Sequence, residues 1–256
     1  MIYIRPSYLT KNDQLNVPED ASYLKELKMQ RLAKHFIPPF FLTVVSIFKK
    51  MHPISVLGGY IPGEGRMSST EIWKRRDGWR EGLKMEPGRD GHCSLVLGKE
   101  GFIVTGGWMT ENMVQLYNIT SKTWKNLTQI PSEAERAYHG CARLNKTHII
   151  IAGGKGTFDN GHLRSSWIFD IKKGIWSQAG DMNQKRDETA LINIGGAVVA
   201  VGGYDENDYW INIEKFNPTT NSWNVLETKM KAKRQTHALA NVPHMWFDYF
   251  YGGCQL

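Results

Sequence analysis

A pair of adjacent glycines recurs at a nearly constant spacing along this 256-residue chain. The pairs begin at residues 58, 106, 153, 202 and 252, so the steps between them are 48, 47, 49 and 50 residues. A period of this length is the signature of a repeat architecture, in which each unit buries its apolar faces against its neighbours. The ten repeat glycines are Gly58, Gly59, Gly106, Gly107, Gly153, Gly154, Gly202, Gly203, Gly252 and Gly253.

Other landmarks keep the same period. After each of the first four glycine pairs, an apolar residue is followed seven positions later by a tryptophan; these pairs are Ile72 and Trp79, Tyr117 and Trp124, Phe169 and Trp176, and Phe216 and Trp223. Turn-forming residues lie between the two members, as in "FNPTTNSW". Further on comes an arginine, with a histidine or threonine three residues later; these are Arg89 and His92, Arg136 and His139, Arg186 and Thr189, and Arg234 and His237.

One period therefore contains four strand-sized segments separated by turn signals, which is typical of a β-propeller blade. Glycines at the end of a strand remove side chains where a large neighbour presses on the backbone. We expect the tryptophan of the outer strand to be that neighbour and to provide much of the apolar burial of each blade.

The glycine pairs, the spaced aromatic residues and the Arg-x-x-His openings closely resemble the kelch repeat family, from about Phe40 to Gly253. The resemblance implies an all-β, kelch-type β-propeller. Here it would have four blades, about 40–85, 86–130, 131–182 and 183–230, and a partial fifth at 231–256. Such a ring is open, truncated as part of a longer product, or completed by a second chain, and its unpaired edge strands invite self-association.

The apolar run Phe36–Phe48 is too short to span a bilayer. Its position matches a degenerate first strand in which Phe41 and Val44 replace the arginine and histidine, although it also has the character of a signal sequence. Residues 1–39 lie outside the repeat as an extension with one short amphipathic helix. Related proteins often carry a BTB or F-box module that makes them ubiquitin-ligase adaptors, but this segment has neither pattern.

The cysteines Cys93, Cys141 and Cys254 form no close-spaced pair, which argues against a disulfide framework and a zinc site. Cys93 and Cys141 are interpreted as repeat-equivalent core residues. A reducing, cytoplasmic location is the simpler prediction. The sequons at Asn118, Asn126 and Asn145 would matter only in a secreted protein.

No cofactor, metal or catalytic group is predicted. His92, His139 and His237 recur at one repeat position, so they are spread around the axis and are not gathered as ligands. His148, His162 and His244 are assigned to turns or loops without a constellation. Basic residues exceed acidic ones by 32 to 25, but they are dispersed, so nucleic acid is not an expected partner.

The loops after the glycine pairs differ in length and charge although their flanks do not, as expected of a scaffold that presents binding loops. We predict a non-catalytic platform that binds another protein through one propeller face. The candidate contact residues are Trp108, Phe158, Arg164, Tyr204, Tyr209 and Trp210, and Glu133, Glu135, Asp187 and Lys233 are expected on the same face. The alternatives are an extracellular kelch glycoprotein, a copper oxidase resembling galactose oxidase, and an actin-binding protein.

Overall fold

The computed structural model describes residues 43–45, 54–74, 77–98, 100–157 and 161–239. The first sheet has the order β1-β2-β5-β6 and the second has the order β7-β8-β9-β10, all antiparallel. The strands of the first sheet are β1 (Thr43–Val45), β2 (Ile54–Leu57), β5 (Thr70–Lys74) and β6 (Gly78–Glu81). Those of the second are β7 (Cys93–Val96), β8 (Gly101–Thr105), β9 (Val114–Asn118) and β10 (Thr123–Asn126).

The third sheet is β12-β13-β15-β16 and the fourth is β17-β18-β19-β20. The strands of the third are β12 (Gly140–Arg143), β13 (His148–Ala152), β15 (Ser166–Asp170) and β16 (Ile175–Ala179). Those of the fourth are β17 (Ala190–Ile194), β18 (Ala197–Val201), β19 (Asn212–Asn217) and β20 (Ser222–Lys229). Four antiparallel sheets of four strands, arranged as an open ring, confirm the predicted all-β propeller.

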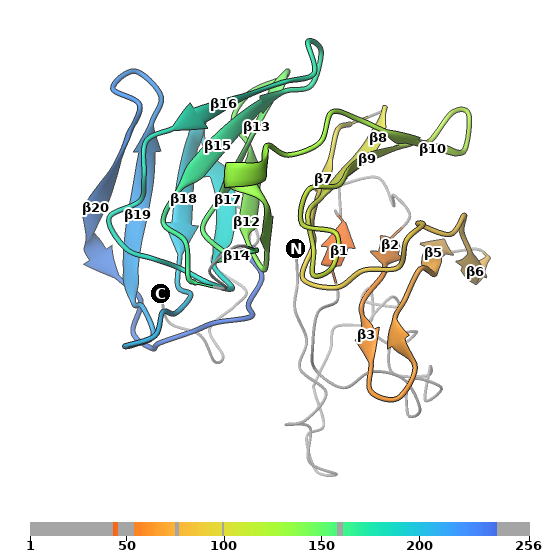
Figure 1. Ribbon diagram of the computed structural model, residues 1–256, viewed down its shortest axis with the longest axis horizontal. Coiled ribbons are helices and arrows are strands. Elements are labelled where there is room, and N and C mark those ends of the chain that lie inside the picture. The colour runs from red at the N-terminus through yellow and green to blue at the C-terminus, as the bar shows by residue number, and fades with distance from the viewer. Residues whose placement is uncertain (1–42, 46–53, 75–76, 99, 158–160, 240–256) are drawn as a thin grey trace, which may run out of the picture.

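Short elements are added to this ring. They are the hairpin β3 (Tyr60–Ile61) with β4 (Gly65–Arg66), the pair β11 (Arg136–Ala137) with β14 (Lys155–Gly156), and the 3₁₀ turn η3 (Ser132–Ala134). In Figure 1, β3 and β14 lie at the lower end, whereas the turn from β15 to β16 and the turn from β19 to β20 lie at the upper end. The loops after the glycine pairs are thus separated from the tight turns by the length of the strands.

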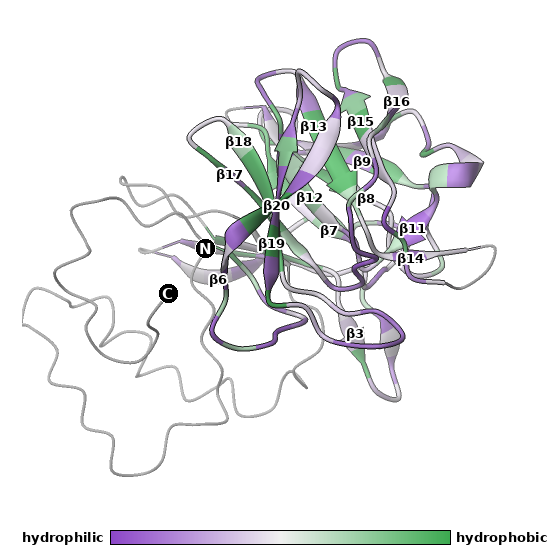
Figure 2. Cartoon of the chain, turned by 90° about the vertical axis from the view of Figure 1, so that its left-hand side faces the viewer, coloured by the Kyte–Doolittle hydropathy of each residue, from purple (hydrophilic) through white to green (hydrophobic). Residues whose placement is uncertain are grey.

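The apolar core consists of layers between neighbouring sheets, because alternate side chains of a strand point to opposite faces. In β13, Ile149 and Ile151 pack toward the second sheet, whereas Ile150 and Ala152 pack toward the fourth. The corresponding central strand β8 is buried along its whole length. Figure 2 shows the most apolar stretches on such central strands. Two-sided burial explains why these strands are continuous apolar runs.

The repeat arginines of the second, third and fourth blades each join two blades. The backbone N–H of Gly154 donates to the carbonyl of Arg186 (2.7 Å), and the Arg186 guanidinium donates to the carbonyl of Gly202 (2.7 Å) in its own blade. Arg136 repeats this arrangement with Gly107 (3.3 Å) and Gly153 (3.1 Å). A chain of hydrogen bonds therefore runs from blade to blade through the glycine pairs.

The neighbour that presses on the first glycine of a pair is this arginine, not the tryptophan that the sequence suggested. A Cβ on Gly106 would collide with the Arg136 carbonyl oxygen and the His139 ring. The outer-strand tryptophans are also less buried than expected, since Trp223 is 4% exposed but Trp79 is 45% exposed. In the first blade Trp79 pairs with Trp73, whereas Ile72 pairs with Arg80.

Strand β1 pairs with β2 at the place predicted for a degenerate first strand. The predicted N-terminal helix, His244, the fifth glycine pair and Cys254 lie outside the described residues. Within the part of the chain that the structure describes, no helix is long and apolar enough to cross a membrane.

Candidate functional site

The loops after the glycine pairs and the segments that lead into the inner strands meet at one end of the propeller. We call this end the loop face and define it by residues 59–69, 86–92, 107–113, 130–139, 154–157, 161–165, 181–189, 203–211 and 231–237. Backbone hydrogen bonds join the two kinds of segment. The Trp108 N–H donates to the Asp90 carbonyl (2.9 Å), and the backbone N–H of Asp187 and of Tyr204 each donate to the carbonyl of the other. The loop face is therefore an ordered surface held by the blade framework.

One group of side chains comes from the loops of the first three blades and includes the contact between the second and third blades. The Tyr138 hydroxyl donates to Oδ2 of Asp90 (3.2 Å), and Nε of Arg66 lies 2.8 Å from Oδ1 of the same carboxylate. The Trp108 ring lies 6.1 Å from the Tyr138 ring, centroid to centroid. Burial and then the Asp90 charge raise the pKa of Tyr138 above its ordinary value, so this hydroxyl stays a hydrogen-bond donor at neutral pH.

A second group lies between the third and fourth blades. Nδ1 of His162 is 3.6 Å from Oδ2 of Asp187, and the His162 ring meets the edge of Tyr204. The Tyr204 ring in turn stacks on Tyr209 at 5.6 Å. Burial, followed by the neighbouring Glu188 charge, raises the pKa of the Asp187 carboxyl to about 7. Asp187 is thus a buried carboxyl that titrates near neutral pH beneath an aromatic surface.

The residue two positions after each repeat arginine has a left-handed backbone. These residues are Gly91, Tyr138, Glu188 and Thr236, with φ angles of 61°, 57°, 52° and 51°. They follow one another around the ring, because the Tyr138 N–H donates to the carbonyl of Gly91 (2.6 Å) and the Glu188 N–H donates to that of Tyr138 (2.9 Å). Left-handed backbone is costly for residues other than glycine and tends to persist where a site requires it.

The structure brings together some of the predicted contact residues. Tyr204 and Tyr209 stack, Trp210 Nε1 donates to the Lys185 carbonyl (2.8 Å), and Trp108 lies beside Tyr138. Arg164 stands apart from the aromatic groups and forms an ion pair with Asp181 (3.3 Å). Phe158 lies outside the described residues. Of the residues expected on the same face, Lys233 forms an ion pair with Asp208 (2.5 Å).

Sequence reasoning missed Asp90, Tyr138, Glu188 and His162. His162 was assigned to no constellation, but the strand-like bridge between Lys155 and residue 162 places it against Asp187 and Tyr204. Gly91 could have predicted the left-handed backbone of Tyr138 and Glu188, because these residues have the same position in the repeat and a glycine in one copy can mark that conformation in all copies. His148, also assigned to a turn, begins β13 and lies 3.6 Å from Asp170.

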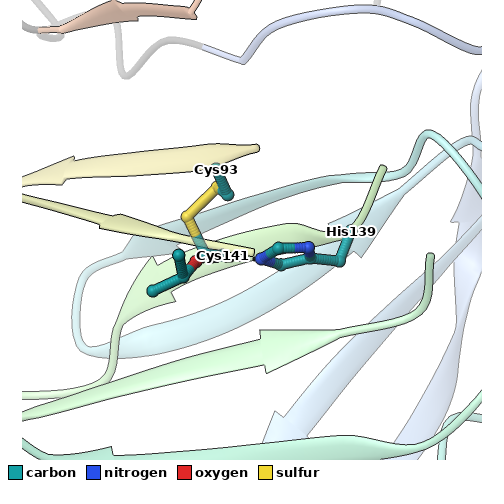
Figure 3. The surroundings of a disulfide bond; sticks show 4 residues. Cys93, His139 and Cys141 are labelled. Atoms are coloured by element: carbon teal, nitrogen blue, oxygen red, sulfur yellow. Dashed lines mark hydrogen bonds between the residues drawn. A yellow bond between two sulfur atoms is a disulfide. The ribbon is translucent and has the colours of Figure 1, made fainter. Parts of the chain in front are cut away.

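Cys93 and Cys141 form a disulfide, which corrects the prediction that these cysteines do not pair. Their Cα atoms are 6.0 Å apart, inside the range of about 4.4 to 6.8 Å that disulfides span. Figure 3 shows the sulfur–sulfur bond between β7 and β12 with the His139 ring beside it. The prediction of a reducing compartment loses the support that it took from unpaired cysteines.

The repeat histidines are neutral structural residues. Burial and the nearby Arg89 charge lower the pKa of His92 to about 3, and burial lowers that of His139 well below its ordinary value. His139 Nε2 lies 2.9 Å from the Thr105 hydroxyl, so the ring is held in the framework. Among the described residues, no group of three or more His, Cys, Asp or Glu is placed to hold a metal ion.

The sequence model of the KLHDC2/KLHL20/DRC7 Kelch-repeats domain matches residues 91–255. The chain belongs to the kelch-repeat family. Kelch-like protein 36 of Mus musculus is 26% identical over 239 residues, covering 90% of this chain and 37% of that protein. Kelch repeat-containing protein kel-10 of Caenorhabditis elegans is 24% identical over 201 residues, covering 75% of this kelch chain and 34% of the relative.

F-box/kelch-repeat protein At2g44130 of Arabidopsis thaliana is 24% identical over 145 residues, which is 53% of this kelch chain and 35% of that protein. The chain thus spans about a third of the length of these relatives. Kelch-like relatives support a protein-interaction module as the general class.

Proposed function

We propose that this kelch chain is a non-catalytic scaffold that binds a partner protein through its loop face. The observation that carries the proposal is the presence of tyrosine and tryptophan side chains from three blades on this face, as the ring pairs Trp108 with Tyr138 and Tyr204 with Tyr209, and as Trp210. Aromatic side chains bury much area at a small cost in conformational entropy, and they are enriched at interface centres. Their backbone is already fixed by the arginine and glycine framework, which lowers the cost of ordering on binding.

Charge on the loop face adds to this chemistry. The buried carboxyl groups of Asp90 and Asp187 are hydrogen-bonded to Tyr138 and Tyr204, and Glu206 and Asp208 form ion pairs with Lys185 and Lys233 at the surface. A partner segment that offers hydrogen-bond donors and apolar contacts together fits such a surface.

The proposal is tested by affinity enrichment with the natural chain and two single variants. Tyr209→Ala removes a side chain that is 46% exposed on the loop face, and Ile175→Ala removes one that is 58% exposed at the opposite end. We expect a specific partner to be retained by the natural chain and Ile175→Ala and to be weakened about tenfold or more by Tyr209→Ala. Equal retention by both variants would refute binding through the loop face.

An extracellular kelch glycoprotein is the second candidate, because the structure contains a disulfide and exposes two sequon asparagines. Asn126 and Asn145 are both at the surface, in β10 and in the turn before β13. Disulfides persist in oxidising compartments. If this candidate is correct, peptide N-glycosidase shifts the electrophoretic mobility of the natural protein, and Asn145→Gln reduces that shift.

A further inference from the structure

The two bonded cysteines stand one step apart in the repeat. Cys93 directly follows His92 and pairs with Thr105, the residue before a glycine pair, and Gly140 has the same place in the third blade because it pairs with Ala152. Cys141 is one residue further on. Cys93 and Cys141 are therefore not repeat-equivalent, which corrects the interpretation made from the sequence. Because successive side chains of a strand point to opposite faces, this offset points the Cys93 thiol toward the third blade and the Cys141 thiol toward the second, across the junction between them.

The next junction contains the same contact without sulfur. A Cβ on Gly140 would collide with Cδ1 of Leu191, and Leu191 stands in the fourth blade where Cys141 stands in the third. A glycine and a leucine thus fill the space that the disulfide fills one junction earlier. Neighbouring blades can therefore pack at this position with or without a covalent bond. The dithiol form of the junction between the second and third blades is thus compatible with the fold.

We propose that Cys93 and Cys141 are a redox-controlled cross-link that sets the rigidity of the loop face where the second and third blades meet. Cys93 is partly exposed, whereas Cys141 is 4% exposed. The reaction partner is a small disulfide of the glutathione class. The Cys93 thiolate attacks one sulfur of oxidised glutathione and releases one reduced glutathione, which takes up the proton. Cys141 then attacks the Cys93 sulfur of the mixed disulfide and releases the second.

The cross-link adjoins the loop face on both strands, because Cys93 directly follows residue 92 and Cys141 lies two residues beyond residue 139. Gly91 lies two residues before Cys93 and Tyr138 lies three residues before Cys141, and the Tyr138 N–H donates a 2.6 Å hydrogen bond to the Gly91 carbonyl. A Cβ on Gly91 would collide with the Tyr138 ring, so the two segments are in direct contact. A covalent bond behind this contact limits the opening of the junction, and its reduction frees Asp90 and Tyr138 to separate. Any effect on a partner rests on the proposed function.

The experiment uses the full chain with Cys254→Ser, so that thiol counts refer only to the pair. Buffers of increasing reduced-to-oxidised glutathione ratio are followed by thiol alkylation and mass spectrometry, thermal unfolding, and amide hydrogen exchange. We expect zero alkylated thiols in the oxidised state and two in the reduced state. Reduction should lower Tm by about 5 to 15 °C and speed the exchange of the Tyr138 amide at least about tenfold.

The matched control is the double variant Cys93→Gly with Cys141→Leu, which copies the packing of the next junction. We expect it to fold and to exchange the Tyr138 amide at one rate in all glutathione buffers. The proposal is overturned if the bond survives about 5 mM reduced glutathione, if Tm and exchange are the same in both states, or if the double variant still responds. These measurements need no partner protein, so they test the cross-link even if the proposed function is wrong.

Discussion

The guanidinium of Arg186 lies 3.0 Å from the carboxylate of Glu214, and both side chains are completely buried. Glu214 also accepts hydrogen bonds from the backbone N–H (2.6 Å) and the side-chain amide (2.9 Å) of Asn183. One carboxylate of β19 therefore holds the segment that enters the fourth blade. In the second blade the same place is occupied by Gln115, whose Oε1 accepts from the Arg89 guanidinium at 2.6 Å.

This comparison predicts different costs for two substitutions of Glu214. Glu214→Ala leaves the Arg186 charge buried without a partner and should lower the free energy of unfolding by about 3 to 5 kcal/mol. Glu214→Gln keeps an acceptor, as Gln115 does for Arg89, and should cost about 1 to 2 kcal/mol. Urea unfolding measures both. If the two variants lose equal stability, the charge matters and the hydrogen bond does not.

The repeat glycines should be far less tolerant of a methyl group than the glycines of a plain turn. Gly153 and Gly195 both have positive φ, 66° and 59°, but a Cβ on Gly153 would meet the Arg186 carbonyl oxygen, whereas nothing lies within 4 Å of one on Gly195. We expect Gly195→Ala to cost about 1 kcal/mol for the backbone strain alone. Gly153→Ala should cost several times more, as measured by the urea midpoint at unchanged m value.

A third prediction concerns the left-handed backbone of the loop face. Glu188 has φ of 52°, and its carboxylate accepts a hydrogen bond from the Thr236 hydroxyl. Glu188→Ala and Glu188→Gly both lose that bond, so their difference isolates the backbone. We expect Glu188→Gly to be about 1 kcal/mol more stable than Glu188→Ala by thermal unfolding. Equal stabilities would show that the segment relaxes out of the left-handed region.

The sequence could predict the four sheets because their landmarks are local and periodic. The glycine pairs and the runs such as "IIIA" follow directly from strand ends and from two-sided burial. The residues of the loop face were harder to predict, because their environment depends on contacts between blades. The residue type of Tyr138 does not predict its left-handed backbone, and His162 lies near Asp187 only because the loop that contains it folds back.

The disulfide was missed for a similar reason. Cys93 and Cys141 are 48 residues apart, close to the repeat period, which suggests equivalence. The period between their own arginines, Arg89 and Arg136, is 47 residues, and the single extra residue reverses the direction of the side chain. Cys93 lies four residues after Arg89, whereas Cys141 lies five residues after Arg136. Counting each cysteine from the arginine of its own blade, instead of using the approximate period, would have predicted that the two thiols face each other.

The raised pKa of Asp187 predicts a specific pH dependence of stability. Its carboxyl has an ordinary pKa of 3.8 but titrates at about 7 when folded, because burial and then Glu188 disfavour its charge. Between these values the folded state binds more protons than the unfolded state, so this contribution is complete below about pH 4 and is lost as the pH rises through 7. The slope should approach about 1.4 kcal/mol per pH unit at most.

The buried histidines act in the opposite direction. The pKa values of His92 and His237 are lowered to about 3 and about 4, so their contribution is lost as the pH falls below their ordinary range. The prediction therefore concerns the difference between the natural chain and Asp187→Asn, which keeps the histidines. Urea unfolding from pH 4 to pH 8 should show Asp187→Asn gaining stability relative to the natural chain as the pH rises. A constant difference across this range would mean that Asp187 is ionised throughout and that its carboxyl does not titrate near pH 7 in the folded chain.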